Sequence, residues 1–269
     1  MGTKNGRVWI LTIFATVFVN SADTCTYGKA LEQRSAETVR IASFNIQVFG
    51  TSKMAKSHVV DTLAKVIRNF DIVAIQEVRA KSPDVIPSFI KHVNADGSSY
   101  QYVIGPRLGR TTSKEQYTFL YDTRRIEVDT TSVGTMQDPG DRLHRPPLFV
   151  RFRSRMLPPE DDIILLGGLN AAPKQFGRLG TLHDITWAVS GTTTNTRRTK
   201  TYDNLVFERT TTAEYTGRWG VLDLQSTYGL SLQQALEVSD HNPVWAAFTA
   251  RESIPKNTAS LPAHTGRLN

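Results

Sequence analysis

The sequence predicts a layered α/β sandwich, and this prediction depends on the order of its apolar segments. Residues 39–47 (VRIASFNIQ) have the composition of a buried strand, and residues 57–69 carry apolar side chains at helical spacing. Residues 71–76 (DIVAIQ) are a second short apolar strand, after which several strand-like runs follow one another. A strand, a helix, a strand and further strands in succession favour packed sheets over a strictly alternating parallel sheet.

The later elements are expected from the same patterns. Residues 88–94 can form the next helix, with residues 95–99 as its loop. Further strands are expected at residues 100–105, 117–122, 148–153, 162–166, 202–207 and 243–248. Because no segment between them has the composition of a linker, residues 26–250 are predicted to be one domain. Residues 251–269 are polar and lack periodicity, which indicates a flexible tail.

The N-terminus has the parts of a secretory signal peptide. Lys4 and Arg7 precede an apolar run over residues 8–19, and the small residues Ser21 and Ala22 follow it. The run is short for a transmembrane helix, which needs about 20 apolar residues, so a membrane anchor is the less favoured alternative. We therefore expect residues 1–22 to be removed and the mature protein to be extracellular. Cys25 is the only cysteine, so no internal disulfide can form.

The composition is that of an ordinary globular protein with a basic surface. Of its 269 residues, 39% are hydrophobic and 21% are charged, and the formal net charge is +7. A positive net charge favours binding to polyanions, of which nucleic acid is the most obvious. The same charge also fits an anionic membrane or a plain role in solubility.

Polar residues lie at the ends of several apolar runs. They are Asn45, Gln76 with Glu77, Asn170, and Asp240 with His241. A half-buried acid costs several kcal/mol unless it is paired or bound to a metal. Strand ends that meet at one edge of a sheet are common places for ligands in α/β proteins. Each residue alone would more often be a turn residue or a strand cap.

All of these residues except Asn170 fall within a series of five ordered blocks that resembles deoxyribonuclease I. The blocks are SFNIQVFG (43–50), IQEVR (75–79), KEQYTFLY (114–121), YDNLVF (202–207) and SDHNPV (239–244). The last, with the upstream QE, is typical of the wider endonuclease/exonuclease/phosphatase superfamily. SFNIQxFG, KEQY and RPP-x-x-VRF narrow the resemblance to the deoxyribonuclease I branch. It implies two packed β-sheets flanked by helices, and hydrolysis of DNA phosphodiester bonds with a divalent metal.

The resemblance also implies roles for single residues. Asn45 and Glu77 would hold Mg²⁺ or Ca²⁺, which prefer oxygen ligands, and Asp240 would share that task or orient a partner. His241 would be one half of the acid/base pair. Glu115 corresponds to the carboxylate that orients a second histidine. The residues expected to contact phosphate or DNA are Arg79, Arg145, Asn170 and Asp203.

The sequence departs from the family where the second histidine should stand. The family has an H-T-x-P-type strand and a helix between the VRF strand and the GDFN strand. Here residues 150–155 run almost directly into residues 161–166, so one strand–helix unit is missing. His183 is a weak candidate for a replacement base.

Further departures concern metal and DNA binding. Gly168 stands where the family has a metal-binding Asp, Ala172 replaces a second acid, and Ser113 replaces a Tyr.

These departures leave several functions open. The chain could be a secreted endonuclease with weak or no activity, acting on DNA as a monomer. It could instead be a non-catalytic secreted protein that binds DNA or another protein. It could also be a splice or gene-model variant of an active nuclease, although Gly168 and Ala172 lie outside the gap. A phosphatase or sphingomyelinase of the same superfamily is disfavoured by the branch-specific blocks.

Overall fold

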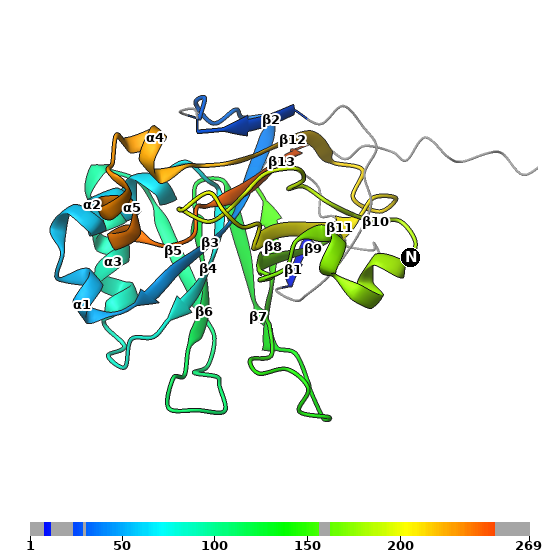
Figure 1. Cartoon of the computed structure of the whole chain (residues 1–269), viewed down its shortest axis with the longest axis horizontal. Helices are drawn as coiled ribbons and strands as arrows, with labels where there is room; N and C mark the ends of the chain where they lie inside the picture. The colour runs from blue at the N-terminus through cyan, green and yellow to red at the C-terminus, as the bar shows by residue number, and fades with distance from the viewer. Residues whose placement is uncertain (1–7, 12–23, 29–30, 156–161, 251–269) are drawn as a thin grey trace, which may run out of the picture.

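Two β-sheets pack face to face in the protein, as a computed structural model of residues 8–11, 24–28, 31–155 and 162–250 describes it (Figure 1). The seven-stranded sheet has the order β2-β12-β13-β3-β4-β6-β5, and the six-stranded sheet has the order β10-β11-β9-β1-β8-β7. This arrangement confirms the predicted two-sheet sandwich.

The seven-stranded sheet contains the strands that were expected first. β3 (Thr38–Phe49) pairs parallel with β4 (Ile72–Val78) and antiparallel with β13 (Val244–Thr249). The other members are β2 (Thr24–Tyr27), β5 (Tyr100–Ile104), β6 (Gln116–Asp122) and β12 (Tyr215–Val221). Both faces of β3 are buried, because helices cover one face of the sheet and the second sheet covers the other.

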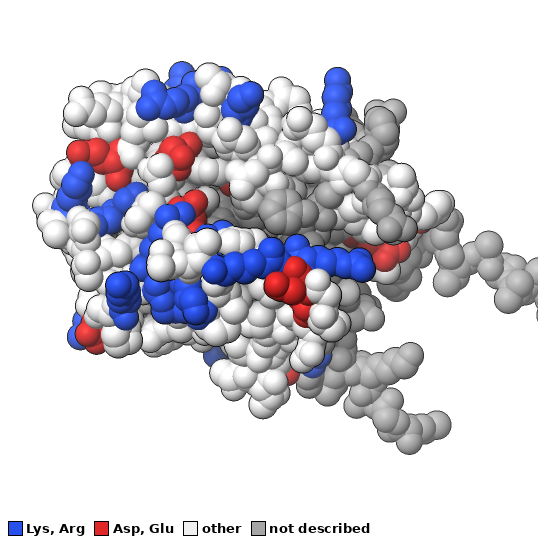
Figure 2. Space-filling view, turned by 60° about the horizontal axis from the view of Figure 1, so that its bottom comes forward, with Lys and Arg blue, Asp and Glu red and all other residues white. Residues whose placement is uncertain are grey.

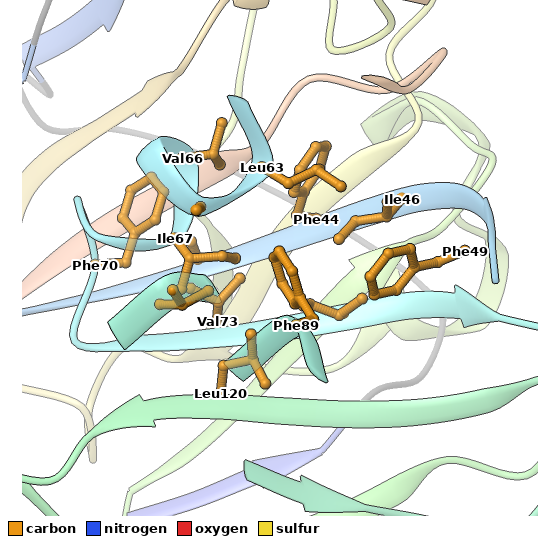
Figure 3. Close-up of a cluster of buried hydrophobic side chains, with 14 of the residues drawn as sticks. Phe44, Ile46, Phe49, Leu63, Val66, Ile67, Phe70, Val73, Phe89 and Leu120 are labelled. Carbon is orange, nitrogen blue, oxygen red and sulfur yellow. The ribbon is translucent and has the colours of Figure 1, made fainter. Parts of the chain in front are cut away.

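Helices cover the outer face of this sheet. They are α1 (Thr51–Met54), α2 (Ser57–Ile67), α3 (Val85–Val93), α4 (Leu224–Tyr228) and α5 (Leu232–Val238). Leu63, Val66 and Ile67 of α2 pack near Phe44 of β3 and Val73 of β4, and all five are fully buried (Figure 3). α3 begins three residues before the expected helix, and α4 and α5 are too short for a clear sequence period.

The six-stranded sheet supplies the other half of the sandwich. Its strands are β1 (Val8–Leu11), β7 (Ile126–Thr135), β8 (Leu148–Ser154), β9 (Ile163–Gly168), β10 (Ile185–Trp187) and β11 (Asp203–Glu208). A second core, which includes Ile41, Phe119, Val150, Leu166 and Leu205, fills the space between the sheets. Outside this sheet lie only short 3₁₀ turns within the described residues, at Pro173–Gln175 and Gly177–Thr181.

The N-terminal segment enters the six-stranded sheet. Val8–Leu11, part of the predicted signal peptide, forms β1 between β8 and β9. β2 begins at Thr24, two residues before the expected start of the domain. The expected tail at residues 251–269 lies outside the described residues. No helix in the described part of the chain is long and apolar enough to cross a membrane.

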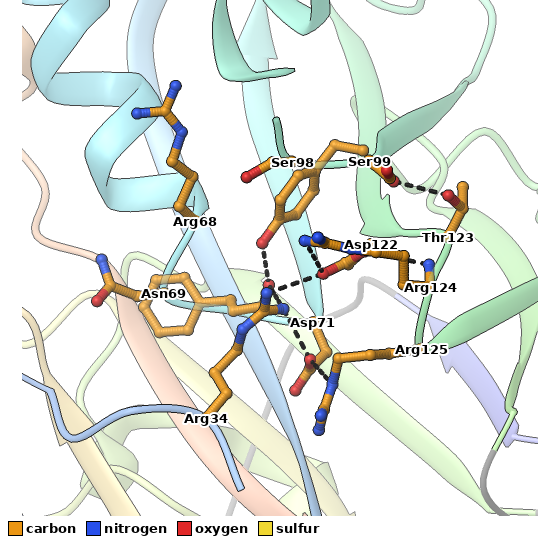
Figure 4. Close-up of polar contacts among 12 residues, drawn as sticks. Arg34, Arg68, Asn69, Asp71, Ser98, Ser99, Asp122, Thr123, Arg124 and Arg125 are labelled. Atoms are coloured by element: carbon orange, nitrogen blue, oxygen red, sulfur yellow. Dashed lines mark hydrogen bonds and ion pairs between the residues drawn. The ribbon is translucent and has the colours of Figure 1, made fainter. Parts of the chain in front are cut away.

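A buried ionic cluster fixes the start of β4, at the end opposite the polar strand ends. Asp71 is fully buried and pairs with Arg34 at 2.9 Å and with Arg125 at 2.5 Å (Figure 4). Its other oxygen accepts the Arg40 backbone N–H at 2.7 Å. Arg34 also pairs with Asp122 at 2.8 Å, so the cluster connects β4 with the end of β6.

Replacing Asp71 by Asn should destabilise the fold, because two partly buried guanidinium groups would lose their shared negative charge. We expect the free energy of unfolding to fall by about 3 kcal/mol, measured by urea denaturation. Asp61→Asn is the matched control, since Asp61 is exposed and pairs with the exposed His92, and it should cost less than about 1 kcal/mol. Equal effects of the two substitutions would contradict the role given to the cluster.

Candidate active site

The candidate site lies at one edge of the core between the two sheets. Along β4, Ile72 and Ala74 face that core, and by strand alternation Gln76 takes the next position on the same face. Along β9, Ile164 and Leu166 face it, and Gly168 follows them. Along β11, Leu205 and Phe207 belong to the core and Asp203 precedes them. The apolar faces of both sheets therefore turn polar at one edge.

An irregularity in β4 turns Glu77 toward this edge. Strict alternation would send Glu77 after Val73 and Ile75 into the helix-side core, where Val78 lies instead. Glu77 has a positive φ of 59°, and at this residue β4 shifts register against both of its neighbours, β3 and β6. Backbone irregularities of this kind often turn a side chain toward a functional site.

Asn45 and Glu77 form the oxygen-rich part of the site. The Asn45 amide Nδ2 donates to Glu77 Oε1 at 3.1 Å, and the Val48 backbone N–H donates to Oε2 at 3.0 Å. Asn45 Oδ1 is buried and has no hydrogen-bond partner within the described residues. An unpaired buried amide oxygen beside a carboxylate suits a hard cation. No cluster of three or more His, Cys, Asp or Glu side chains suited to a metal occurs in the described residues.

His241 and Asp203 form a buried pair that joins the two sheets. His241 Nδ1 lies 2.9 Å from each carboxylate oxygen of Asp203, and both side chains are buried. Asp203 also accepts a hydrogen bond from the Thr194 hydroxyl at 2.7 Å. Burial by itself lowers the pKa of His241, but the Asp203 carboxylate outweighs it and raises this pKa to about 9.

This geometry corrects the role predicted for Asp203. The sequence analysis placed it among the residues that contact phosphate or DNA. Asp203 is 1% exposed and its charge is directed at His241, so it orients the imidazole instead. Its position in the YDN block was noticed, but a block match alone does not say which neighbour a carboxylate faces. Thr194, which holds Asp203 in turn, had no sequence signal.

A charged cluster forms one wall of a cleft beside this pair. Glu115 is 5% exposed and pairs with Arg79 at 2.8 Å and with Arg145 at 2.9 Å. Burial raises the pKa of Glu115, although both arginines act in the opposite direction. The cleft is lined by residues from four strand ends and the 136–147 loop, including Asn45, Glu77, Glu115, His144, Arg145 and Asn170.

Among the residues that the structure describes, Glu115 therefore does not hold a second histidine. It was expected to orient one, but its ion pairs are with Arg79 and Arg145. The two arginines, expected at phosphates, line the cleft while they share this carboxylate. His183 lies outside the cleft lining, pairs with Asp184 and has a side chain that is 93% exposed. It is not placed to replace the missing base.

Gly168 lies among the catalytic candidates. A Cβ atom added to it would lie 3.3 Å from Asp203 Oδ1, 3.8 Å from Asn45 Nδ2 and 3.9 Å from His241 Cε1. A carboxylate at this position would therefore reach the same space as Asn45 and His241. The glycine leaves that space without a second charged ligand.

The remaining site residues lie at the rim. The side chain of Asp240 is 44% exposed and its Oδ1 lies 4.0 Å from His241 Nε2. Asn170, two residues after the end of β9, is exposed and lines the cleft.

Lys53 of α1 was not among the predicted site residues. Burial lowers its pKa to about 8, against the nearby carboxylates of Asp240 and Glu77.

Known proteins are similar to this chain in sequence or in fold. The sequence matches the endonuclease/exonuclease/phosphatase family over residues 42–241. It is 29% identical over 261 residues to deoxyribonuclease-1 from Bos taurus, covering 79% of this chain and 93% of the relative. It is 30% identical over 255 residues to deoxyribonuclease-1-like 1 from Bos taurus, and the match covers 78% of this chain and 80% of the relative. A solved endonuclease/exonuclease/phosphatase family protein from Bacteroides thetaiotaomicron superposes with a TM-score of 0.54 at 14% identity, covering 79% of this chain and 97% of that one.

The chain belongs to the endonuclease/exonuclease/phosphatase family. The predicted resemblance to deoxyribonuclease I is confirmed, because relatives with that name match most of the chain. The solved bacterial structure supports the fold alone.

The arrangement can perform one of the two proton transfers that hydrolysis of a phosphodiester needs. The Asp203 carboxylate fixes the orientation of the imidazole through Nδ1, which leaves Nε2 as the atom that can exchange a proton with a ligand. Within the described residues, no second histidine is held by a carboxylate at the cleft.

Asp203→Asn should lower the pKa of His241 from about 9 toward its ordinary value of 6.5, because burial would then be opposed only by the more distant carboxylates of Asp240 and Glu77. An NMR titration of the His241 ring protons measures this shift. Asp240→Asn is the control and should lower the pKa less, since Asp240 is half exposed.

The same shift predicts a pH dependence of stability. The raised pKa stabilises the folded protein fully below pH 6.5, and this contribution is lost as the pH rises to about 9. Over this range the wild type should lose roughly 3 kcal/mol of unfolding free energy that Asp203→Asn does not lose. Parallel pH profiles of the two proteins would contradict the assignment.

Proposed function

We propose that the chain is a metal-dependent endodeoxyribonuclease by descent whose own hydrolytic activity is weak. The observation that carries this proposal is the buried Asp203–His241 pair beside Asn45 and Glu77, with Gly168 in the same space. This pair is one half of an acid/base site, and among the described residues no second histidine at the cleft is paired with a carboxylate. DNA is the proposed substrate and the protein is proposed to act as a monomer.

A bound Mg²⁺ or Ca²⁺ would neutralise the scissile phosphate. Asn45 Oδ1 and the Glu77 carboxylate are the oxygens that would hold it, with Asp240 at the rim as a third candidate. The Glu77 carboxylate also forms an ion pair with Arg79 at 3.2 Å, so a cation would have to compete with the guanidinium group. Gly168 has no side-chain oxygen to add. We therefore expect weak metal binding.

The chain's own residues would then divide the remaining work. His241 Nε2 would move a proton to or from the reacting oxygen, while Asp203 keeps the imidazole oriented and charged. Arg79 and Arg145 would bind phosphate at the cleft wall, since the planar guanidinium group suits a phosphate oxygen pair. His144 also lines the cleft, but among the described residues only His241 is held there by a buried carboxylate, so only one of attack and departure is assisted in this way.

The surface around the cleft fits a polyanion. Figure 2 shows Lys and Arg side chains gathered across the face that carries the loops at the bottom of Figure 1, with fewer acidic side chains among them. The loops that flank the cleft contribute Arg107, Arg110, Lys114, Arg142 and Arg145. This surface also supports the second candidate function, a non-catalytic DNA-binding protein.

Plasmid nicking in Mg²⁺ should be slower than that of an intact deoxyribonuclease by at least about 10³-fold, from the lost acid/base group alone. The measurement is the rate of conversion of supercoiled to nicked plasmid. His241→Ala should remove the remaining activity, and His264→Ala, outside the domain, should not. Robust nicking that His241→Ala abolishes would overturn the claim of weak activity, because another group would then supply the second transfer.

Gly168→Asp should strengthen metal binding without restoring activity. A carboxylate at this position adds a charged oxygen next to Asn45, and we expect Mn²⁺ to bind at least about tenfold more tightly, measured by titration calorimetry. Gly168→Asn has the same shape without the charge and is the matched control. Recovery of nicking should require the missing strand–helix unit as well. Equal Mn²⁺ affinity in both variants would refute the proposed metal position.

DNA binding should be independent of sequence and sensitive to salt, because phosphate contacts release counterions. In gel-shift titrations the affinity should fall steeply from about 50 mM to physiological salt. Arg142→Gln in the 136–147 loop should reduce the salt slope by about 1, whereas Lys91→Gln on α3 should leave it unchanged. No binding at about 50 mM salt would count against the DNA assignment.

Export is the final part of the proposal and depends on the charged flank and apolar run of residues 1–22. Expression in a secreting cell followed by N-terminal sequencing of the protein in the medium should give a chain that begins near residue 23. Retention of an uncut chain inside the cell would contradict it.

A further inference from the structure

The six-stranded sheet has an element out of sequence order at its centre. β8 ends at Ser154 and β9 begins at Ile163, so eight residues, 155–162, connect two strands that are not neighbours in the sheet. β1 lies between them, antiparallel to β8 and parallel to β9. This is the place in the chain order where the sequence lacks a strand–helix unit.

The register shows that β1 completes the hydrogen-bonding pattern on both sides. Ile10 stands opposite Val150 of β8 and opposite Ile164 of β9. Val150 and Ile164 are both buried in the core between the sheets. Directly paired residues share a face of a sheet, so Ile10 occupies a register position on the buried face. Trp9 and Leu11 occupy the alternate positions.

An empty position between β8 and β9 would lower the stability of the folded protein. The two strands would be separated by about 9.5 Å, twice the usual spacing, and each would present a row of unpaired backbone groups. Unpaired backbone N–H and C=O groups cost free energy when they are removed from water. β7 and β11 already pair with the other edges of β8 and β9, so neither can fill the position.

We propose that this position is a strand-binding site and that the chain's own apolar segment Val8–Leu11 is its occupant. The segment replaces, from the N-terminus, the internal strand that the chain lacks. Its apolar sequence suits a strand at the centre of a sheet and also fits the core of a signal peptide. The proposal does not depend on nuclease activity.

The two uses of the segment compete. Removal of residues 1–22 before folding would take β1 away and leave the position between β8 and β9 open. The uncut chain, in contrast, carries its missing strand with it. The completeness of the sheet therefore depends on whether the N-terminal segment is retained.

The first test uses the full chain with a single substitution. Ile10→Pro removes a backbone N–H and restricts φ, so it should disrupt β1. Hydrogen exchange of the amides in β8 and β9 should accelerate by at least about tenfold, since each lost hydrogen bond is worth roughly this factor. Ser21→Pro, in the same segment but outside β1, is the control and should leave these amides unchanged. Unchanged exchange in Ile10→Pro would overturn the proposal, because β8 and β9 would then pair directly.

The second test remains informative if Ile10→Pro does not fold. A protease site is introduced after Ala22 of the full chain, and the folded protein is cut. The N-terminal fragment should stay associated on size exclusion, and a labelled synthetic peptide of residues 1–22 should replace it only after unfolding and refolding. Immediate separation of the fragment, with an unchanged thermal unfolding midpoint, would refute β1 as the occupant.

Discussion

The buried contact between Asp203 and His241 is the interaction on which the site depends. Asp203 starts β11 of one sheet, and His241 stands just before β13 of the other, so their contact joins both halves of the sandwich at the cleft. A paired charge is tolerated in this position because the imidazole and the Thr194 hydroxyl satisfy the carboxylate. The pair therefore serves the fold as well as the proposed chemistry.

The first strands of the domain could be predicted because they are buried on both faces. The apolar runs that became β3 and β4 have no polar alternation, and the structure shows why: helices cover one side and the second sheet covers the other. Asn45 and Glu77 interrupt such runs, so they could be recognised as site residues. β7 could not, since its sequence (IEVDTTSVGT) is polar and half exposed and makes its pairs only in the assembled sheet.

The rest of the site could not be predicted, because it depends on contacts between distant segments. Glu115 lies in a recognisable block, but its pairing with Arg79 and Arg145 follows from how β4, β6 and the 136–147 loop meet. The bulge at Glu77 has no sequence signal that separates it from regular strand. β1 is the clearest case: the same apolar residues fit a signal peptide and an inserted strand, and only the tertiary context distinguishes the two.

We propose that the cleft keeps one oxygen-lined position for a cation beside the His241–Asp203 pair. Anomalous diffraction from crystals soaked in Mn²⁺ tests this most directly, since it locates the ion without relying on activity. We expect a single weak peak at the cleft, next to Asn45 and Glu77, that is lost in Glu77→Gln. No peak at the cleft, or a strong peak that survives Glu77→Gln, would contradict it.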